Sequence, residues 1–362
     1  MFTLPNTQFG VLGNEESSRL QTFDVPLPDS GEVLIRNGAV ASNPKDWKHP
    51  KRHNNFSYIE GSDVAGEVVK VGDGVTEYKV GERVAAFTKM DTQQNKVVFF
   101  FYGGYAQYSV APVATTIPLP DSTSFEAGST LPLAVFTAAI GLFVNLGLKE
   151  PISSGTAANG DTEGIIVYGA SSSVGAYVVQ LAKSAGYFVV GVAGSSSDYV
   201  TSLGADVVID YRAHNDAQLE DALVKALSGY TCSTAYDAIV AGNSTVTLAR
   251  AVAKTSPNGS GKVTHILPLS DDLKKQFPSN VAPVHTYVGT AFSKDEAFCT
   301  RFSQLLVSLL VSPTRPFQPN RVKLMPNGLA SVGEGLELLK GNKVHGEKLV
   351  YRIADTPKAG GA

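Results

Sequence analysis

The sequence predicts an α/β protein in which βαβ units interrupt an all-β region. Short alternating or apolar runs, separated by Gly, Pro, Asn and Asp, fill residues 20–118 and are typical of a small barrel or sandwich. From Phe125 onwards the apolar spacing becomes that of helices, and residues 164–212 then read strand, small-residue turn, helix and strand. Two kinds of folding unit are therefore expected in one chain.

The individual elements follow from the same patterns. In the all-β region we expect strands at 32–36, 67–71, 83–87 and 107–110, followed by helical runs at 126–131 and 134–148. Strand and helix runs then alternate: 165–168, 174–185, 188–192, 207–210, 235–240, 244–253, 262–267, 285–288 and 294–311. The last part predicts a helix at 331–340 and a strand at 348–353.

The turn after the strand at 165–168 is built from small residues. It reads Ala170-x-Ser172-x-x-Gly175 in place of the usual G-x-G-x-x-G. A tight turn at a helix start aims backbone N–H groups at a pyrophosphate, and serine hydroxyls add donors. The predicted phosphate-binding residues are Ala170, Ser171, Ser172, Ser173, Val174 and Gly175. The alternative is a βαβ layer whose small residues serve only close packing.

The end of the second strand bears on which nucleotide binds. A site for NAD places Asp or Glu there to bond the ribose 2′-OH. This chain has Ser195, Ser196 and Ser197 instead, and Asp198 comes later, in the next predicted helix turn. The serines can donate to a 2′-phosphate, and Tyr211 follows the third strand within reach. The sequence therefore favours NADP(H).

Composition narrows the class of protein. A chain of 362 residues, 43% hydrophobic and 17% charged, is long enough for two globular domains. The net charge of −3, without a basic run, argues against nucleic acid and anionic membranes as partners. With no signal-peptide pattern and no apolar run of membrane-spanning length, we expect a cytoplasmic protein. The two cysteines, Cys232 and Cys299, are expected to be free thiols without a role.

Five segments carry a resemblance to a known family. They are Asn43-Pro44-Lys45-Asp46-Trp47-Lys48, Gly61 to Val68, Val71-Gly72 through Val84, Gly104 to Tyr108, and His345-Gly346-Glu347-Lys348-Leu349-Val350. In this order they resemble the medium-chain dehydrogenase/reductase superfamily, above all its zinc-free branch of fungal trans-acting enoyl reductases and quinone-reductase-like proteins.

The resemblance implies a Rossmann nucleotide-binding domain inserted into a GroES-like β-barrel catalytic domain. The implied boundaries are 1–134 and 312–362 for the catalytic domain and 135–311 for the nucleotide domain. The chain is then expected to act as a monomer or a homodimer.

Metal ligands are missing from the positions where alcohol-oxidising members of the family hold zinc. Asn43, Ser62 and the region 131–133 stand there, and 91–103 contains no cysteine. We therefore predict that no metal is bound. A competing possibility pairs His49 and His53 with Glu60 or Asp63, although Pro50 and a loop-like sequence lie between the two histidines.

The resemblance also implies site residues. Asn43, Lys48 and Tyr58 are the candidate catalytic donors, against the alternatives of a turn-opening Asn, a solvated Lys and a packed Tyr. Further cofactor contacts are implied for Lys45, Asp46, Thr137, Leu267, Val344 and His345; Thr137 could equally bond its own helix backbone. The segment Val288-Gly289-Thr290-Ala291-Phe292 is expected to line the substrate pocket, or else to form an edge strand or a dimer contact.

These expectations lead to a reaction class. Without a Lewis acid to hold an alkoxide, reduction of a double bond conjugated to a carbonyl is favoured over alcohol chemistry. The expected substrate is an enone or an enoyl thioester, the latter free or presented by an acyl carrier domain. A quinone or alkenal reductase acting on small free molecules, and a non-enzymatic NADPH-binding protein, stay open.

Overall fold

The computed structural model describes residues 3–13, 18–48, 58–88, 103–152 and 162–357. The chain forms two compact units, each with its own sheet and core. The first comprises residues 1–133, 290–311 and 319–362, and the second comprises residues 134–289 and 312–318. Both ends of the chain therefore contribute to the first unit, and the second is an almost continuous insertion.

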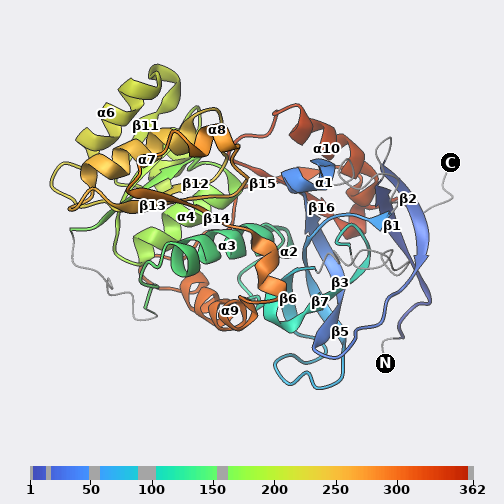
Figure 1. Ribbon diagram of the computed structural model, residues 1–362. Coiled ribbons are helices and arrows are strands. Elements are labelled where there is room, and N and C mark those ends of the chain that lie inside the picture. Colours follow the sequence, from blue (N-terminus) through green and yellow to red (C-terminus); the bar gives the residue numbers. More distant parts are fainter. Residues whose placement is uncertain (1–2, 14–17, 49–57, 89–102, 153–161, 358–362) are drawn as a thin grey trace. The chain divides into compact units, whose positions relative to one another are not determined.

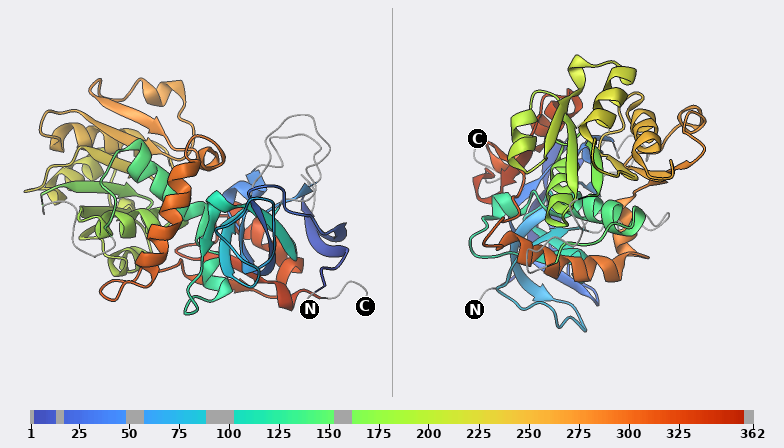
Figure 2. Two further views of the ribbon diagram at one scale, coloured as in Figure 1. Left: turned by 90° about the horizontal axis from the view of Figure 1, so that it is seen from below. Right: turned by 90° about the vertical axis from the view of Figure 1, so that its left-hand side faces the viewer.

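Within the described residues, the first unit contains a seven-stranded and a three-stranded sheet (Figures 1 and 2). The larger sheet has the order β15-β16-β3-β5-β6-β8, with β7 also paired to β3, and the smaller has the order β2-β1-β4. The strands are β1 (Thr7–Gly13), β2 (Ser18–Asp24), β3 (Glu32–Ala41), β4 (Tyr58–Ile59), β5 (Asp63–Val71), β6 (Arg83–Phe87), β7 (Tyr108–Pro112), β8 (Thr116–Pro118), β15 (Val322–Met325) and β16 (Lys348–Arg352).

Strand β3 is the centre of this unit. It pairs along its length with β5, and on its other edge with β7 in its first half and β16 in its second. Val33, Ile35 and Val40 lie in the main core, and Leu34 belongs to a separate cluster with Tyr108 and Val110. Apolar side chains therefore cover both faces of β3, which is why its sequence lacks a polar alternation.

The first unit also contains helices. They are α1 (Pro44–Lys48), α2 (Phe125–Gly128), α9 (Glu296–Leu310) and α10 (Val332–Lys340). The 3₁₀ turns are Val113–Thr115, Gly328–Ser331 and Ile353–Asp355. Ser124 caps α2 by accepting a hydrogen bond from the Ala127 N–H at 3.2 Å.

The second unit has a parallel sheet, six-stranded in the described residues, of order β11-β10-β9-β12-β13-β14 (Figure 1). The strand order reverses between β9 and β12, where doubly wound sheets bind nucleotides. Its strands are β9 (Gly164–Tyr168), β10 (Phe188–Ala193), β11 (Val207–Asp210), β12 (Thr234–Asp237), β13 (Gly261–His265) and β14 (Val281–His285).

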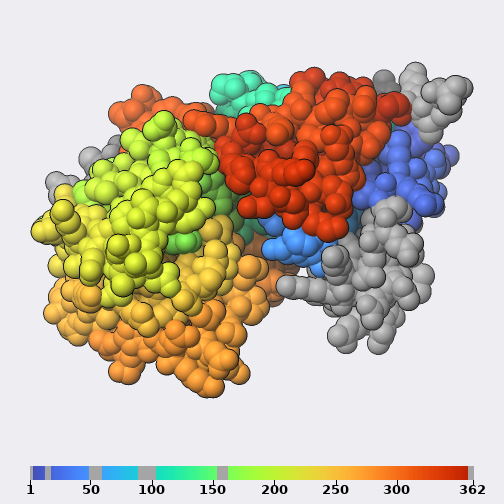
Figure 3. Space-filling model, turned by 90° about the horizontal axis from the view of Figure 1, so that it is seen from above, coloured from blue at the N-terminus to red at the C-terminus, as the bar shows by residue number. Residues whose placement is uncertain are grey.

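Helices connect these parallel strands. They are α4 (Ser173–Ser184), α5 (Ser197–Ser202), α6 (Asp216–Ala226), α7 (Ser244–Thr255) and α8 (Asp271–Lys274), with a 3₁₀ turn at Tyr211–Ala213. The helix α3 (Pro132–Ala139) leads into the unit, and the 3₁₀ turn Val288–Phe292 leads out of it. In the space-filling view, residues from α6 to β14, yellow to orange, gather over one face of the unit (Figure 3).

One predicted helix changes its hydrogen bonding midway. Residues 134–148 were expected to be a single helix, but α3 passes into a π-helical turn at Ile140–Asn145. The Tyr236 hydroxyl donates to the Thr137 carbonyl at 2.8 Å, and a Cβ on Gly141 would overlap the Tyr236 ring. Tyr236 thus occupies the Thr137 carbonyl, which an α-helical hydrogen bond would otherwise use. Gly141 leaves space for the tyrosine ring because it has no side chain.

Two strands differ from the predicted bounds. β12 ends at Asp237, not at 240, because the Asp237 carboxylate accepts hydrogen bonds from the N–H groups of Ile239 and Val240. β14 lies at Val281–His285 and not at 285–288. It includes Pro283, which an edge strand tolerates because its missing N–H is not needed for pairing on the open side.

Helix α9 belongs to the first unit, although the predicted nucleotide domain extended to residue 311. It packs on the 3₁₀ turn Val113–Thr115 and on β8. Just before it, the Phe292 ring lies 4.7 Å from that of Phe87, between ring centroids. Apolar contacts with distant parts of the first unit therefore place α9 in that unit. The helical period of the α9 sequence does not reveal those contacts.

We predict that Gly66→Ala destabilises the first unit. A Cβ at this position of β5 would overlap the Arg36 carbonyl oxygen on β3, so the pairing of the two strands must shift. We expect a loss of about 1–3 kcal/mol in the free energy of unfolding, measured by urea titration. Gly333→Ala on α10 is the control, because its Cβ would meet only Ser18 at 3.4 Å and alanine favours the helix. Equal stability of the two variants would contradict the prediction.

Candidate functional site

The turn between β9 and α4 has the form of a phosphate-binding turn. Gly169 adopts a left-handed φ of 70°, and the Ser172 N–H donates to its carbonyl at 2.8 Å. Ser172 is also the N-cap of α4, where its Oγ accepts from the Gly175 N–H at 3.0 Å. The twelve-residue helix then directs the N–H groups of its first turn, and the positive end of its dipole, towards the turn.

Gly175 allows the helix to approach the turn. A Cβ at this position would overlap the Gly169 carbonyl oxygen and crowd the Cα of Ala170. Any larger residue would push α4 away from β9 and open the turn. The small residues of this segment therefore serve packing, which does not exclude a phosphate-binding role for the same turn.

The end of β10 meets the end of β11 in the same unit. A Cβ on Gly194 would lie 3.0 Å from Tyr211 Cε1 and 3.4 Å from Arg212 Nε, so both side chains lie beside the serine segment Ser195–Ser197. Tyr211 is 43% exposed. The Arg212 guanidinium bonds Asp210 Oδ2 at 2.6 Å and holds the pKa of that carboxyl at about 2. A tyrosine hydroxyl, serines and a guanidinium thus gather where a ribose 2′-substituent would be recognised.

Asp237 organises the loop at the carboxyl end of β12. Its buried carboxylate accepts from the Ser244 hydroxyl at 2.6 Å, the Thr245 hydroxyl at 2.7 Å and the Val240 N–H at 2.8 Å. Val240 has a left-handed φ of 54°, which is costly for a β-branched residue, and these bonds hold it there. The sequence analysis missed Asp237, although an Asp ending a strand beside the switch point was a usable signal.

The first unit contains a buried cluster of charged and amide side chains. Lys348 Nζ donates to Asp63 Oδ2 at 2.7 Å and to Asn43 Oδ1 at 3.0 Å. Asn43 Nδ2 donates to the same Asp63 oxygen at 2.8 Å, and the Leu133 N–H donates to Asp63 Oδ1 at 2.7 Å. All the hydrogen-bonding atoms of the Asp63 side chain are therefore occupied, as a buried carboxylate requires.

A second group of bonds continues from Asn43 into α1. Its backbone N–H donates to Asp46 Oδ2 at 2.7 Å, and the Tyr105 hydroxyl donates to the same oxygen at 2.7 Å. Lys45 Nζ lies 3.0 Å from Asp46 Oδ1 and 3.8 Å from Glu60 Oε2. Ser42 links the hydroxyls of Tyr105 and Tyr351, each at 2.8 Å.

Burial governs the titration of this second group. It raises the pKa of Asp46, which the Lys45 ammonium only partly opposes and the Glu60 carboxylate reinforces. Burial also raises the pKa of Tyr105 well above its usual range. For Lys45, burial acts to lower the pKa, but Asp46, Glu60 and Asp63 outweigh it and the pKa lies above its ordinary value. One ammonium thus faces two buried carboxylates.

The remaining predicted residues fall in several places. Lys48 ends α1, with its Nζ 5.3 Å from the Trp47 ring centroid, and Tyr58 begins β4. Val344 is half-buried and His345 exposed, before β16. Thr137 is buried in α3, and the Leu267 carbonyl is bonded to His265 Nδ1 at 2.8 Å. The segment Val288–Phe292 is a 3₁₀ turn and not an edge strand.

The structure brings some of the predicted residues together within each unit. In the second, the turn at 170–175, the serines, Tyr211 and Leu267 all follow carboxyl ends of strands in one sheet. In the first, Asn43 and Asp46 join the buried cluster with Lys45. Tyr105 and Lys348, which sequence reasoning did not assign to a site, complete it with Asp63, which was considered only as a ligand of the competing metal site.

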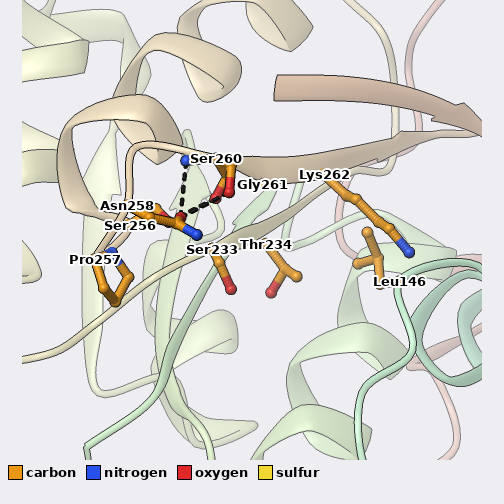
Figure 4. Close-up of a pocket in the computed structure, with 9 residues that line it drawn as sticks. All are labelled: Leu146, Ser233, Thr234, Ser256, Pro257, Asn258, Ser260, Gly261 and Lys262. Atoms are coloured by element: carbon orange, nitrogen blue, oxygen red, sulfur yellow. Dashed lines mark hydrogen bonds between the residues drawn. The ribbon is translucent and has the colours of Figure 1, made fainter. Parts of the chain in front are cut away.

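A polar pocket of about 460 Å³ lies at the amino ends of two strands of the parallel sheet, opposite to the carboxyl ends where the turn lies (Figure 4). Ser233 and Thr234 line it at the start of β12, and Gly261 and Lys262 at the start of β13. Asn258 Oδ1 accepts from the N–H of Ser260, and Lys262 Nζ from β13 contacts the Asn145 carbonyl at 3.4 Å. Since nucleotides bind at carboxyl ends of strands, this pocket is separate from the nucleotide turn.

Two family models match the chain. The alcohol dehydrogenase GroES-like domain matches residues 29–121, and the model described as zinc-binding dehydrogenase matches residues 173–279. The trans-enoyl reductase fsr4 of Gibberella fujikuroi is 33% identical over 74% of this chain and 77% of its own. The trans-enoyl reductase ACTTS2 of Alternaria alternata is 32% identical over 94% and 97%. A chloroplastic quinone-oxidoreductase QR1 of Triphysaria versicolor is 36% identical over 67% and 68%.

Solved structures share the fold. A putative zinc-dependent alcohol dehydrogenase from Rhizobium etli has a TM-score of 0.75 at 22% identity, covering 96% of this chain and 98% of that one. A mycobacterial protein solved with NADPH has a TM-score of 0.71 at 20% identity, covering 95% and 99%.

The inserted unit has a parallel sheet with a turn of the phosphate-binding form, and the other unit, made from both chain ends, is mostly antiparallel. This combination is that of a nicotinamide-dependent oxidoreductase. The chain belongs to the medium-chain dehydrogenase/reductase superfamily, with a GroES-like and a Rossmann-like domain.

The zinc named in one family description does not fit the donors described here. Within the residues that the structure describes, no three His, Cys, Asp or Glu side chains form a group that could hold a metal ion. Asn43 already accepts from a lysine ammonium, which would repel a cation. Cys232 and Cys299 are buried in different units, where burial raises each thiol pKa to about 12. His49 and His53 lie outside the described residues, and the metal-free prediction stays a prediction.

Among the described residues, no helix is both long and apolar enough to cross a membrane.

We predict that Ser172→Asp weakens NADPH and NADH alike, by at least about tenfold in Kd. Asp is a good N-cap, so α4 keeps its start, but the added carboxylate faces the pyrophosphate. Fluorescence titration of both cofactors measures the effect. Ser172→Ala is the matched control: it removes the cap without adding charge, and should lower stability by about 1 kcal/mol and affinity by less. Unchanged affinity in Ser172→Asp would show that this turn does not hold the pyrophosphate.

Proposed function

We propose that the protein is an NADPH-dependent reductase of a carbon–carbon double bond conjugated to a carbonyl. The expected substrate is an enoyl thioester or an enone. The observation that carries the proposal is the buried Asn43–Asp63–Lys348 cluster, which offers hydrogen-bond donors and includes Asn43, a position where the resemblance implies a metal ligand in alcohol-oxidising members of the family. Similarity to two trans-enoyl reductases over most of the chain supports the same reaction class.

The chemistry matches this donor set. The bound cofactor supplies a hydride to the β-carbon of the conjugated system. Negative charge then develops on the carbonyl oxygen, spread over an enolate that a few hydrogen bonds can stabilise without a Lewis acid. Asn43 and Lys48 are the proposed donors to that oxygen, and Tyr58 the proposed source of the proton that the α-carbon takes up.

NADPH is the proposed cofactor because of the residues around β10 and β11. No carboxylate follows β10 until Asp198 in α5, and the nearby Asp210 is neutralised by Arg212. Ser195, Ser196, Tyr211 and Arg212 supply donors suited to a 2′-phosphate. The mycobacterial structure of this fold, solved with NADPH, is consistent with that choice.

Quinone reduction is the second candidate, supported by the similarity to a chloroplastic quinone-oxidoreductase. It needs the same nucleotide turn and the same donors, since a quinone reduced by hydride leaves a delocalised phenolate. An acyl carrier domain as the bearer of the thioester is a further part of the proposal, because carrier proteins are acidic and Lys45 and Lys48 adjoin the cluster. Lys51 and Arg52, which follow closely in the sequence, lie outside the described residues.

We predict that NADPH binds more tightly than NADH by well over tenfold. Each charge-assisted hydrogen bond to the 2′-phosphate is worth about 1.5–3 kcal/mol, and two are available. Titration of both cofactors gives the ratio of their Kd values. Arg212→Gln should reduce that ratio and leave the Kd of NADH unchanged, because NADH has no 2′-phosphate. Equal Kd values for the two cofactors in the wild type would remove the argument.

We predict that deuteride from labelled NADPH appears at the β-carbon of the product. Mass spectrometry and NMR of the products from enones, enoyl thioesters and quinones would locate the label. Deuterium on a carbinol carbon, with the double bond intact, would show a carbonyl reductase instead. The same screen of substrates separates the enoyl candidate from the quinone candidate.

A further inference from the structure

Lys348 has a buried ammonium that the proposed mechanism leaves without a role. The residue is 3% exposed, at the start of β16, and its Nζ contacts Asp63 Oδ2 and Asn43 Oδ1. A lysine is rarely retained at such a position, because removing an ammonium from water costs several kcal/mol that a single ion pair seldom repays. The second contact of Lys348, to the uncharged Asn43 amide, indicates a role for its ammonium beyond the ion pair with Asp63.

The two neighbours of Asn43 fix the orientation of its side-chain amide. An ammonium can only donate hydrogen bonds, so the Asn43 oxygen must face Lys348. An ionised carboxylate can only accept, so the Asn43 NH₂ group must face Asp63. A rotation of the amide by 180° would place NH₂ against an ammonium and oxygen against a carboxylate, and lose both bonds.

This orientation leaves one N–H of Asn43 over. One hydrogen of Nδ2 is used by Asp63 Oδ2 at 2.8 Å, and the described residues accept no bond from the other. The ammonium also polarises the amide, since charge drawn to the oxygen makes the N–H groups better donors. The Asn43 side chain therefore offers an N–H donor, and not its oxygen, to any further partner.

We propose that Lys348 is a positioning residue of the reductase site, which acts through Asn43 by fixing its amide as a hydrogen-bond donor. The inference rests on the proposed function, in which Asn43 donates to the developing enolate. It adds a residue that neither the motif nor the resemblance had placed in the site. It also gives a reason why an ammonium is buried here: the cation lies behind a neutral amide and fixes its orientation.

The alternative is that Lys348 only balances the charge of Asp63. The two roles differ in one variant. Asp63→Leu/Lys348→Met removes both charges together and replaces them with apolar side chains of similar size, a change that often preserves stability. A charge-balancing lysine then has nothing to balance, so activity should return. If Lys348 instead fixes the Asn43 amide, activity should stay low in the double variant, because both partners of the amide are gone.

The experiment compares kcat in wild type, Lys348→Met, the double variant and Asn43→Asp, each normalised to the fraction that binds NADPH. Asn43→Asp keeps an oxygen for Lys348 but removes the N–H. We expect kcat to fall at least tenfold in all three variants, with the Kd of NADPH within twofold of wild type. Recovery of kcat to within twofold of wild type in the double variant would overturn the proposal. If Lys348→Met alone does not fold, the double variant decides.

A second measurement is independent of turnover. With ¹⁵N-labelled asparagine, the side-chain NH₂ signals of Asn43 are assigned by their loss in Asn43→Asp. In the wild type we expect slow hydrogen exchange of the N–H bonded to Asp63, and in the double variant fast exchange and shifted signals. Unchanged signals in the double variant would contradict the fixed amide. If the wild type reduces no conjugated acceptor, the proposed function fails, and these signals still test the orientation of the amide.

Discussion

The first unit depends on the burial of four charged side chains, together with the partly buried Lys45. Asp63 and Lys348 form one pair, and Lys45 faces Asp46 and Glu60 in a second group, with Asn43 bonded to both. Each isolated charge would cost several kcal/mol in this environment, so each position is acceptable only while its partners are present. Three distant parts of the chain must therefore take up their places together, which explains why short elements such as α1 and the start of β16 are so strictly positioned.

The nucleotide unit follows a simpler constraint, and most of it was predictable. A continuous apolar run followed by small residues and a 3.6-residue period predicted β9, the turn and α4 to within one or two residues. The strand at 207–210 was predicted with its observed bounds, and Asp198 lies in the helix turn expected for it. Local patterns are informative here because each strand and helix makes most of its contacts with neighbours in sequence.

Three differences between the predicted and the observed structure depend on specific side-chain contacts. Tyr236 changes the hydrogen bonding of the helix after Ala139, Asp237 ends β12 early, and the packing of α9 on β8 moves a predicted part of the nucleotide domain into the first unit. The candidate site shows the same limit. The motif at 43–48 was visible in the sequence, but its bond to Lys348 spans 305 residues, and no local period carries that information.

That separation has a consequence for the synthesis of the chain. Residues 134–289 contain all six strands of the second unit, and residues 312–318 complete that unit, so it can fold while the ribosome is still making the rest of the chain. The N-terminal part leaves the ribosome first but cannot complete its folding, because Asp63 and Asn43 lack their partner Lys348 until the end of the chain is made. The inserted domain should thus reach its native state before the domain that encloses it. Release of a chain truncated ahead of β16 would leave an aggregation-prone half-domain beside a folded nucleotide domain.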